Sequence, residues 1–123
     1  MPRLTDAQRA QLDALRATYQ AELPQKVEAV AAAAGPLQAA GDDVANLQRF
    51  YDLIHKLAGS AAVYGFDGVG GAASTLEEWA LAGLATGLSE PRRRELPLLV
   101  AALQAALTTS PCSAAGASRA PDP

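Results

Sequence analysis

Aromatic residues are scarce in this sequence of 123 residues, and Phe, Trp and Tyr together account for 5% of it. Aromatic and β-branched side chains are the ones that suit the pleated surface of a sheet, so their scarcity argues against a β protein. Half of the residues are apolar, mainly alanine and leucine, which favour helices. The length fits one domain with one core. The sequence therefore predicts an all-α domain.

The sequence also lacks a second cysteine, an excess of basic residues and a long apolar run. Cys112 stands alone and cannot form an intramolecular disulfide, which suits a reducing compartment. A net charge of −3 argues against a nucleic-acid partner, and we interpret Arg92-Arg93-Arg94 as a solvated helix start. No run approaches the roughly 20 apolar residues of a membrane span, and the N-terminus lacks a signal-peptide core. We expect a cytoplasmic protein with no nucleic-acid or membrane partner.

Apolar residues at spacings of three and four predict helices along most of the chain. Thr5 is a plausible N-cap for a helix over residues 6–22, whose apolar stripe comprises Leu4, Leu12, Leu15 and Tyr19. Proline is tolerated in the first turn of a helix, so Pro24 opens a second segment that ends near Gly35-Pro36. The pattern leaves open whether these are two helices or one kinked helix.

Three further helices follow, each with its own start and stop signals. The Gly41-Asp42-Asp43 segment breaks the chain and caps a long helix that ends near Tyr64, with Gly65 as its stop. Asp67 is predicted to cap a helix that ends near Thr86. The last helix opens at Ser89 and Pro91 and runs through Leu107, with a possible kink at Pro97.

These helices predict an antiparallel four-helix bundle with an additional N-terminal helix or a kinked first helix. We assign the bundle to residues 1–107. Residues 108–123 have no periodicity and are rich in Ser, Ala, Pro and Gly, so we expect a disordered tail.

His55 is the only histidine. On a helical wheel it lies about 90° from the middle of the apolar stripe, and Lys56 projects about 100° away from it. Glycine within a helix costs about 1 kcal/mol relative to alanine, so the nearby glycine suggests that a partner approaches closely. The residues that share the shoulder with His55 are Gln48, Asp52, Gly59 and Ala62.

The neighbourhood of His55 limits its chemistry. No second histidine and no nearby cysteine could complete a metal site, and Ser60 lies about 140° round the helix, too far for a Ser/His/Asp arrangement. Asp52 could accept a hydrogen bond from the ring. A neutral imidazole has a free lone pair and can attack a phosphoryl group without an activating base, so reversible carriage of a phosphoryl group suits this site.

The stretch from His55 to Ala61, followed by Gly65 and by the pair Leu76-Glu77, resembles the signature of histidine-containing phosphotransfer (HPt) domains of bacterial phosphorelays. The resemblance implies a four-helix bundle in which Nε2 of His55 accepts a phosphoryl group from, or passes it to, the aspartate of receiver domains. A (hybrid) sensor histidine kinase would be a further partner. The receiver would supply Mg²⁺, so the protein would need no cofactor and would act as a monomeric carrier without kinase activity.

One position departs from the family pattern. Many members have a lysine three residues after the histidine, and this sequence has Ala58. The departure keeps an alternative open, in which the protein is a non-phosphorylated helical adaptor that docks on a kinase or a receiver. A third reading is a phosphoacceptor module detached from a larger kinase.

Other features are interpreted as structural. The segment "GFDGVGGA" lacks the Lys-Ser/Thr and the strand of a phosphate-binding loop, so it indicates helix punctuation and close helix packing. Trp79 is expected in the core. Glu77 and Glu78 diverge by about 100° on a helix, so we expect both on the solvated surface.

Overall fold

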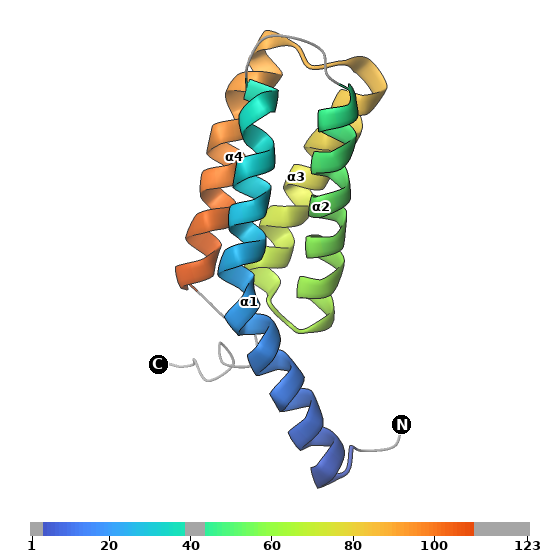
Figure 1. Ribbon diagram of the computed structural model, residues 1–123, viewed down its shortest axis with the longest axis vertical. Helices are drawn as coiled ribbons and strands as arrows, with labels where there is room; N and C mark the ends of the chain where they lie inside the picture. Colours follow the sequence, from blue (N-terminus) through green and yellow to red (C-terminus); the bar gives the residue numbers. More distant parts are fainter. Residues whose placement is uncertain (1–3, 39–43, 110–123) are drawn as a thin grey trace.

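The computed structural model describes residues 4–38 and 44–109. These residues form an up-and-down bundle in which α1 packs against α2 and α4, and α3 packs between α2 and α4 (Figure 1). The prediction of an all-α four-helix bundle is confirmed. The helices are α1 (Asp6–Gln38), α2 (Val44–Val63), α3 (Asp67–Thr86) and α4 (Glu90–Thr109).

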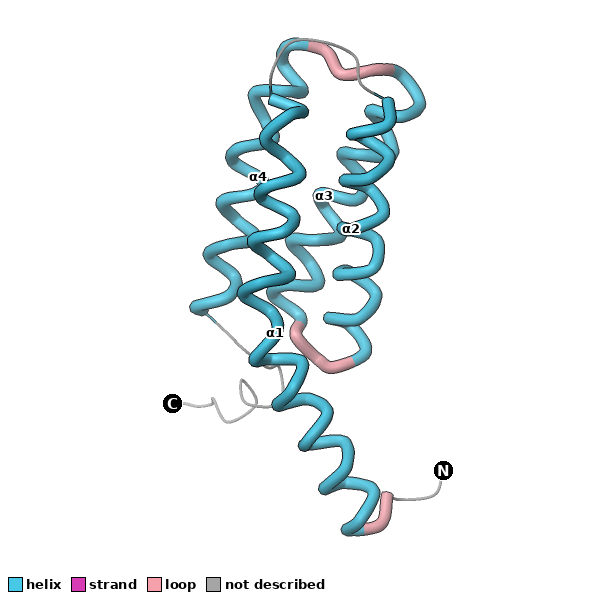
Figure 2. Tube along the Cα trace, viewed as in Figure 1, coloured by secondary structure: helices cyan, strands magenta, loops and turns pink. Residues whose placement is uncertain are grey.

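Helix α1 is one uninterrupted helix, so there is no separate N-terminal helix. Thr5 caps it as predicted, because its hydroxyl accepts the Gln8 N–H at 3.0 Å and its N–H donates to Gln8 Oε1 at 2.8 Å. Pro24 lies inside the helix on its exposed side, where water can satisfy the carbonyl that proline leaves unpaired. The helix therefore continues through both predicted breaks, and its first turns extend beyond the bundle (Figures 1 and 2).

The turn between α2 and α3 is built on Gly65, which has a φ of 82° and ends α2 as predicted. The Phe66 N–H donates to the Ala61 carbonyl at 2.8 Å, and the Gly65 N–H donates to the Ala62 carbonyl at 3.2 Å, which satisfies two terminal carbonyls of α2. The prediction that Asp67 caps α3 is wrong by one position. Asp67 is the first helical residue, and the capping residue Phe66 makes no side-chain capping bond.

Gly70 confirms that the glycine-rich segment serves close helix packing. It is buried in the first turns of α3, and a Cβ at this position would lie 3.7 Å from the Ala61 Cβ of α2. The two helices therefore approach closely just beyond the turn that connects them.

Helix α4 begins one residue after Ser89, whose hydroxyl accepts the Arg92 N–H at 3.4 Å. Pro97 does not end the helix, which continues past the predicted end at Leu107 and includes Thr108 and Thr109. The predicted cap at Gly41-Asp42-Asp43, the predicted tail from residue 110 onward and Cys112 lie outside the described residues.

The arginine triplet is only partly a solvated helix start. Arg93 is buried, and its guanidinium donates to the Leu37 carbonyl near the end of α1 at 2.9 Å. The prediction is therefore wrong for Arg93, because the sequence did not show that the end of α1 lies beside the start of α4. Arg94 is exposed and pairs with Glu90.

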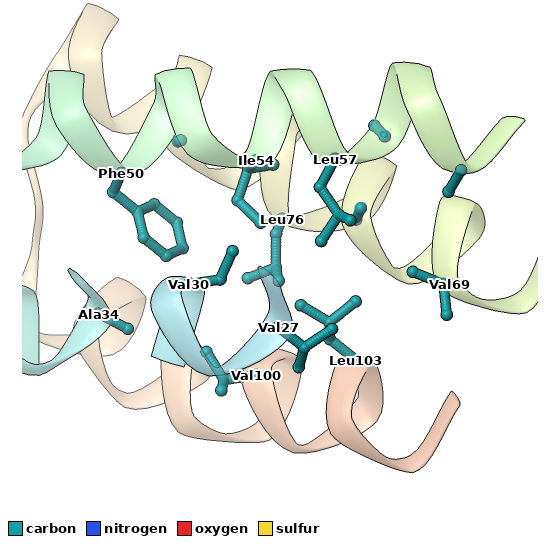
Figure 3. Packing of buried hydrophobic residues seen from close by; sticks show 14 of the residues in the cluster. Val27, Val30, Ala34, Phe50, Ile54, Leu57, Val69, Leu76, Val100 and Leu103 are labelled. Carbon is teal, nitrogen blue, oxygen red and sulfur yellow. The ribbon is translucent and has the colours of Figure 1, made fainter. Parts of the chain in front are cut away.

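The core lies between the four helices and is made of aliphatic side chains with a few aromatic rings (Figure 3). The largest side chains with almost no exposed surface are Phe50, Phe66, Ile54, Leu76, Leu96, Leu103, Val27, Val30 and Val69. Trp79 is also buried, as expected. Of the stripe predicted for the start of α1, Tyr19 belongs to this core. Leu4 and Leu15 do not, because they are about half exposed.

Within residues 4–38 and 44–109, no helix combines the length and the apolar character that a bilayer span requires.

Candidate functional site

His55 projects from the middle of α2 toward solvent, with 63% of its side chain exposed. The opposite face of α2 is held in the core by Phe50, Ile54 and Leu57 (Figure 3). These buried side chains fix the rotation of the helix about its axis. The imidazole therefore lies on the shoulder of the helix, as the helical wheel predicts.

One ring nitrogen of His55 is held by a carboxylate from the neighbouring helix. Nδ1 lies 2.6 Å from Oε2 of Glu77 on α3, and the Glu77 side chain is only 21% exposed. A carboxylate can only accept a hydrogen bond, so Nδ1 donates a proton to it. In the neutral ring, the lone pair is then on Nε2.

The predictions for the two acidic residues near His55 are therefore wrong. Glu77 is not a solvated surface residue, because the approach of α3 to α2 brings it against the ring. Asp52 is not the partner of His55 in this structure, because its Oδ1 accepts a hydrogen bond from Gln48 Nε2 at 3.1 Å. The wheel of a single helix cannot show a partner on another helix, although the pair Leu76-Glu77 in the sequence signature marked this position.

Tyr51 makes a second contact with the imidazole that the sequence analysis missed. Its ring stacks on that of His55, with centroids 5.6 Å apart and an angle of 21° between the planes. The spacing of four residues on one helix is the signal that could have found it. Tyr51 and Glu77 together restrict the orientation of the ring.

The residues on the C-terminal side of His55 are small, so no large side chain protrudes from the surface there. Gly59 is exposed, and a Cβ added to it would meet no atom within 4 Å outside its own helical surroundings. Ala62 is exposed one turn further along α2. Since nothing within the described residues requires the glycine, its small size leaves room for an approaching molecule.

Ala58 occupies the position at which many family members have lysine. It is buried to 8% exposure and lines a shallow pocket of about 150 Å³ between α2 and α3, together with Ala62, Gly70 and Ser74. Asp67 is also on the lining of this pocket. The cation of the family pattern is thus replaced by a methyl group at the surface where α2 meets α3.

Lys56 projects away from the ring, as predicted. It lines a groove between α1 and α2 that also includes Lys26 and the apolar side chains Val30 and Leu57. The two lysines place positive charge on the α1 side of the exposed surface of α2.

Ser60 does not serve His55 as a nucleophile partner. Its hydroxyl lies 2.6 Å from the Tyr19 hydroxyl of α1, and burial raises the pKa of Tyr19, so this phenol stays protonated. Among the described residues, no three His, Cys, Asp or Glu side chains gather in a way that could hold a metal ion.

Comparison with known proteins adds one finding. The family model described as "Hpt domain" matches residues 14–109, which is more than half of the chain. Neither a curated protein nor a solved structure matches the chain significantly.

Proposed function

The chain belongs to the Hpt domain family, whose members are phosphocarrier modules of phosphorelays, and on that premise we propose that Nε2 of His55 carries the phosphoryl group. The observation that supports this assignment is the 2.6 Å contact between His55 Nδ1 and Glu77. It leaves the lone pair on the nitrogen that is free to meet a partner, on a ring that is largely exposed.

The proposed step is a displacement at phosphorus. Nε2 attacks the aspartyl phosphate of a receiver domain, the N–P bond forms, the O–P bond breaks, and the aspartate leaves as a carboxylate. The ring keeps the proton on Nδ1 and therefore becomes positively charged. The Glu77 carboxylate lies beside that proton and stabilises the charged ring, and the reverse step delivers the phosphoryl group to a second receiver.

The chemistry that surrounds the transferred group comes from the partner in this proposal. Hpt domains interact with receiver domains and kinases of two-component systems. We assign the Mg²⁺ that neutralises the phosphoryl oxygens to the receiver, and we propose that this chain needs no cofactor and has no kinase activity of its own.

We assign the docking surface of the receiver to the exposed side of α2. Gly59 and Ala62 provide the clearance, and the polar side chains Gln48 and Asp52 flank His55 on its other side. Lys56 lies next to this surface and can attract the acidic site of a receiver.

Ala58 supports a second candidate function. Ala58 stands in the pocket between α2 and α3, and no lysine or arginine among the described residues lines this pocket. The alternative is an adaptor that docks on a kinase or a receiver and is not phosphorylated. Incubation with a phosphorylated receiver separates the two functions.

The test is transfer from a phosphorylated receiver domain to the purified chain. We expect a label that is stable in base and labile in acid, as a phosphoramidate is, and no label in His55→Gln. Circular dichroism of the variant checks that the bundle is folded. A label that persists in His55→Gln contradicts the proposal, and absence of label in the unmodified chain with every receiver tried supports the adaptor.

Gly59→Leu tests the docking surface. We expect transfer to slow by about tenfold or more, because the new side chain occupies the clearance beside His55, while helix content stays the same or rises slightly. Gly35→Leu is the matched control, since Gly35 is also an exposed helical glycine with no atom close to its Cβ position. Equal transfer rates in both variants would exclude the proposed docking surface.

A further inference from the structure

Tyr51 has a fixed position beside an exposed ring. It lies one turn before His55 on α2, and its half-buried side chain packs against the hydrophobic core. Most of the His55 side chain, by contrast, is in solvent. The core therefore holds the tyrosine in place, and the stack between the two rings orients the imidazole rather than the tyrosine.

The two contacts of His55 are made at different parts of its ring. Glu77 contacts Nδ1 at the edge of the imidazole, at 2.6 Å. Tyr51 covers one face of it, because the planes of the two rings are only 21° apart. Within residues 4–38 and 44–109, the Tyr51 hydroxyl makes no hydrogen bond. What Tyr51 offers His55 is therefore the face of its aromatic ring.

The charge of the imidazole differs between the two states of the proposed transfer. Before transfer the ring is neutral. Afterwards Nε2 has formed the N–P bond, the aspartate has left as a carboxylate, and Nδ1 keeps its proton, so the ring is positively charged. The face of an aromatic ring attracts a cation within about 6 Å of its centroid. The imidazole centroid lies 5.6 Å from that of Tyr51, which is within this range.

We propose that Tyr51 is a positioning residue that stabilises the charged, phosphorylated ring of His55 and thereby shifts the phosphotransfer equilibrium toward this chain. Apolar contact between the two rings is the same in both states and cancels, whereas the attraction of the aromatic face for a cation is added only after transfer. At an exposed site this attraction changes an equilibrium constant by about two- to fivefold. The inference rests on the proposed function, in which Nε2 carries the phosphoryl group.

The equilibrium distribution of the phosphoryl group tests the proposal. The purified chain is mixed with a phosphorylated receiver domain, and the ratio of phosphorylated chain to phosphorylated receiver is measured once it is constant. Tyr51→Leu keeps an apolar side chain against the core but loses the aromatic face, so we expect the ratio to fall about two- to fivefold. Tyr51→Phe keeps the face and loses only the hydroxyl, so we expect the ratio to stay the same.

Two results would overturn the proposal. One is a ratio in Tyr51→Leu equal to that of the unmodified chain, and the other is a ratio in Tyr51→Phe as low as that in Tyr51→Leu. Docking does not interfere when both proteins are too dilute to stay bound. A substitution that only weakens docking then slows the approach to equilibrium and leaves the final ratio unchanged.

Leu53→Ala is the matched control for packing. Leu53 is also half-buried on α2 and packs against the core, but it lies on the α1 side of the helix, in the groove that Lys26 and Lys56 line. Its truncation weakens the core without touching the imidazole, so we expect the equilibrium ratio to stay the same. A fall equal to that in Tyr51→Leu would assign the effect to packing and overturn the proposal.

Proton NMR distinguishes failure of this inference from failure of the proposed function. His55 is the only histidine, so its ring protons report the stack whether or not the chain is phosphorylated. We expect a ring-current shift in the unmodified chain and in Tyr51→Phe that is lost in Tyr51→Leu, and no such difference would overturn the inference. A stacked ring that no receiver labels contradicts the proposed function and the inference with it. Normal labelling with an unchanged ratio in Tyr51→Leu contradicts the inference alone.

Discussion

The contact between His55 and Glu77 determines which ring nitrogen carries the proton in the neutral imidazole. The carboxylate accepts a hydrogen bond from Nδ1–H, so the lone pair of the neutral ring is on Nε2, which faces outward. Tyr51 stacks on the same ring and limits its rotation. In the proposed phosphotransfer, the contribution of this chain is therefore the orientation of one imidazole.

Replacing Glu77 is expected to slow phosphotransfer without unfolding the bundle. Glu77→Gln keeps an acceptor for the Nδ1 proton but loses the negative charge, so we expect a reduction of several-fold, and Glu77→Ala removes both and costs about 10- to 100-fold. The measurement is the transfer rate from a phosphorylated receiver. Glu78→Gln is the control, because Glu78 is exposed and points away from the ring. A Glu77→Ala rate equal to the Glu78→Gln rate would show that the contact is not used.

At this scale, the position of His55 was predictable and its partner was not. The apolar spacing of α2 shows which way each of its own residues points, which places His55, Gly59 and Ala62 correctly. A contact between two helices depends on their separation and relative rotation. Both are set by core packing, which a single-helix wheel does not contain.

At the scale of elements, α1 differs most from its prediction. Local signals at Pro24 and at Gly35-Pro36 indicated breaks, yet the helix passes through both. Proline costs a helix most where its unpaired carbonyl is buried, and Pro24 is exposed. Whether a proline that predicts a break is exposed depends on how the helix packs in the bundle. The sequence therefore left open whether α1 is one continuous helix.

Arg93 connects the end of α1 to the start of α4. Its guanidinium donates to the Leu37 carbonyl from a buried position, so Arg93→Ala leaves a buried acceptor with one partner fewer. We expect a loss of about 1.5–3 kcal/mol in the free energy of unfolding, measured with urea. Arg94→Ala, next to it but exposed, is expected to change the same quantity by less than about 0.5 kcal/mol. Equal losses in the two variants would contradict this role.

At the scale of the whole molecule, all four helices share one core. Side chains of α1, α2, α3 and α4 meet at its centre, where Val27, Ile54, Leu76 and Leu103 lie together (Figure 3). This core was largely predictable, because each helix has its own apolar stripe. The surface proposed for the receiver lies on the outside of this core, on α2.

A single core predicts cooperative unfolding. Leu76→Ala is expected to lower the free energy of unfolding by about 2–5 kcal/mol, since Leu76 is completely buried at the centre. Trp79 fluorescence and helical circular dichroism are expected to shift together to lower denaturant concentration. Separate transitions in the two signals would indicate that the helices do not unfold as one unit.

The first turns of α1 have the backbone hydrogen bonds of a helix but little side-chain cover. Their protection from hydrogen exchange therefore depends on local opening, while the amides from Tyr19 onward are protected by the stability of the whole bundle. We expect the amides before Arg16 to exchange faster than those after it. The guanidinium of Arg16 donates to the Tyr64 carbonyl, which makes it the first side chain of α1 to bond to the turn after α2. One continuous helix is thus expected to open on two different timescales.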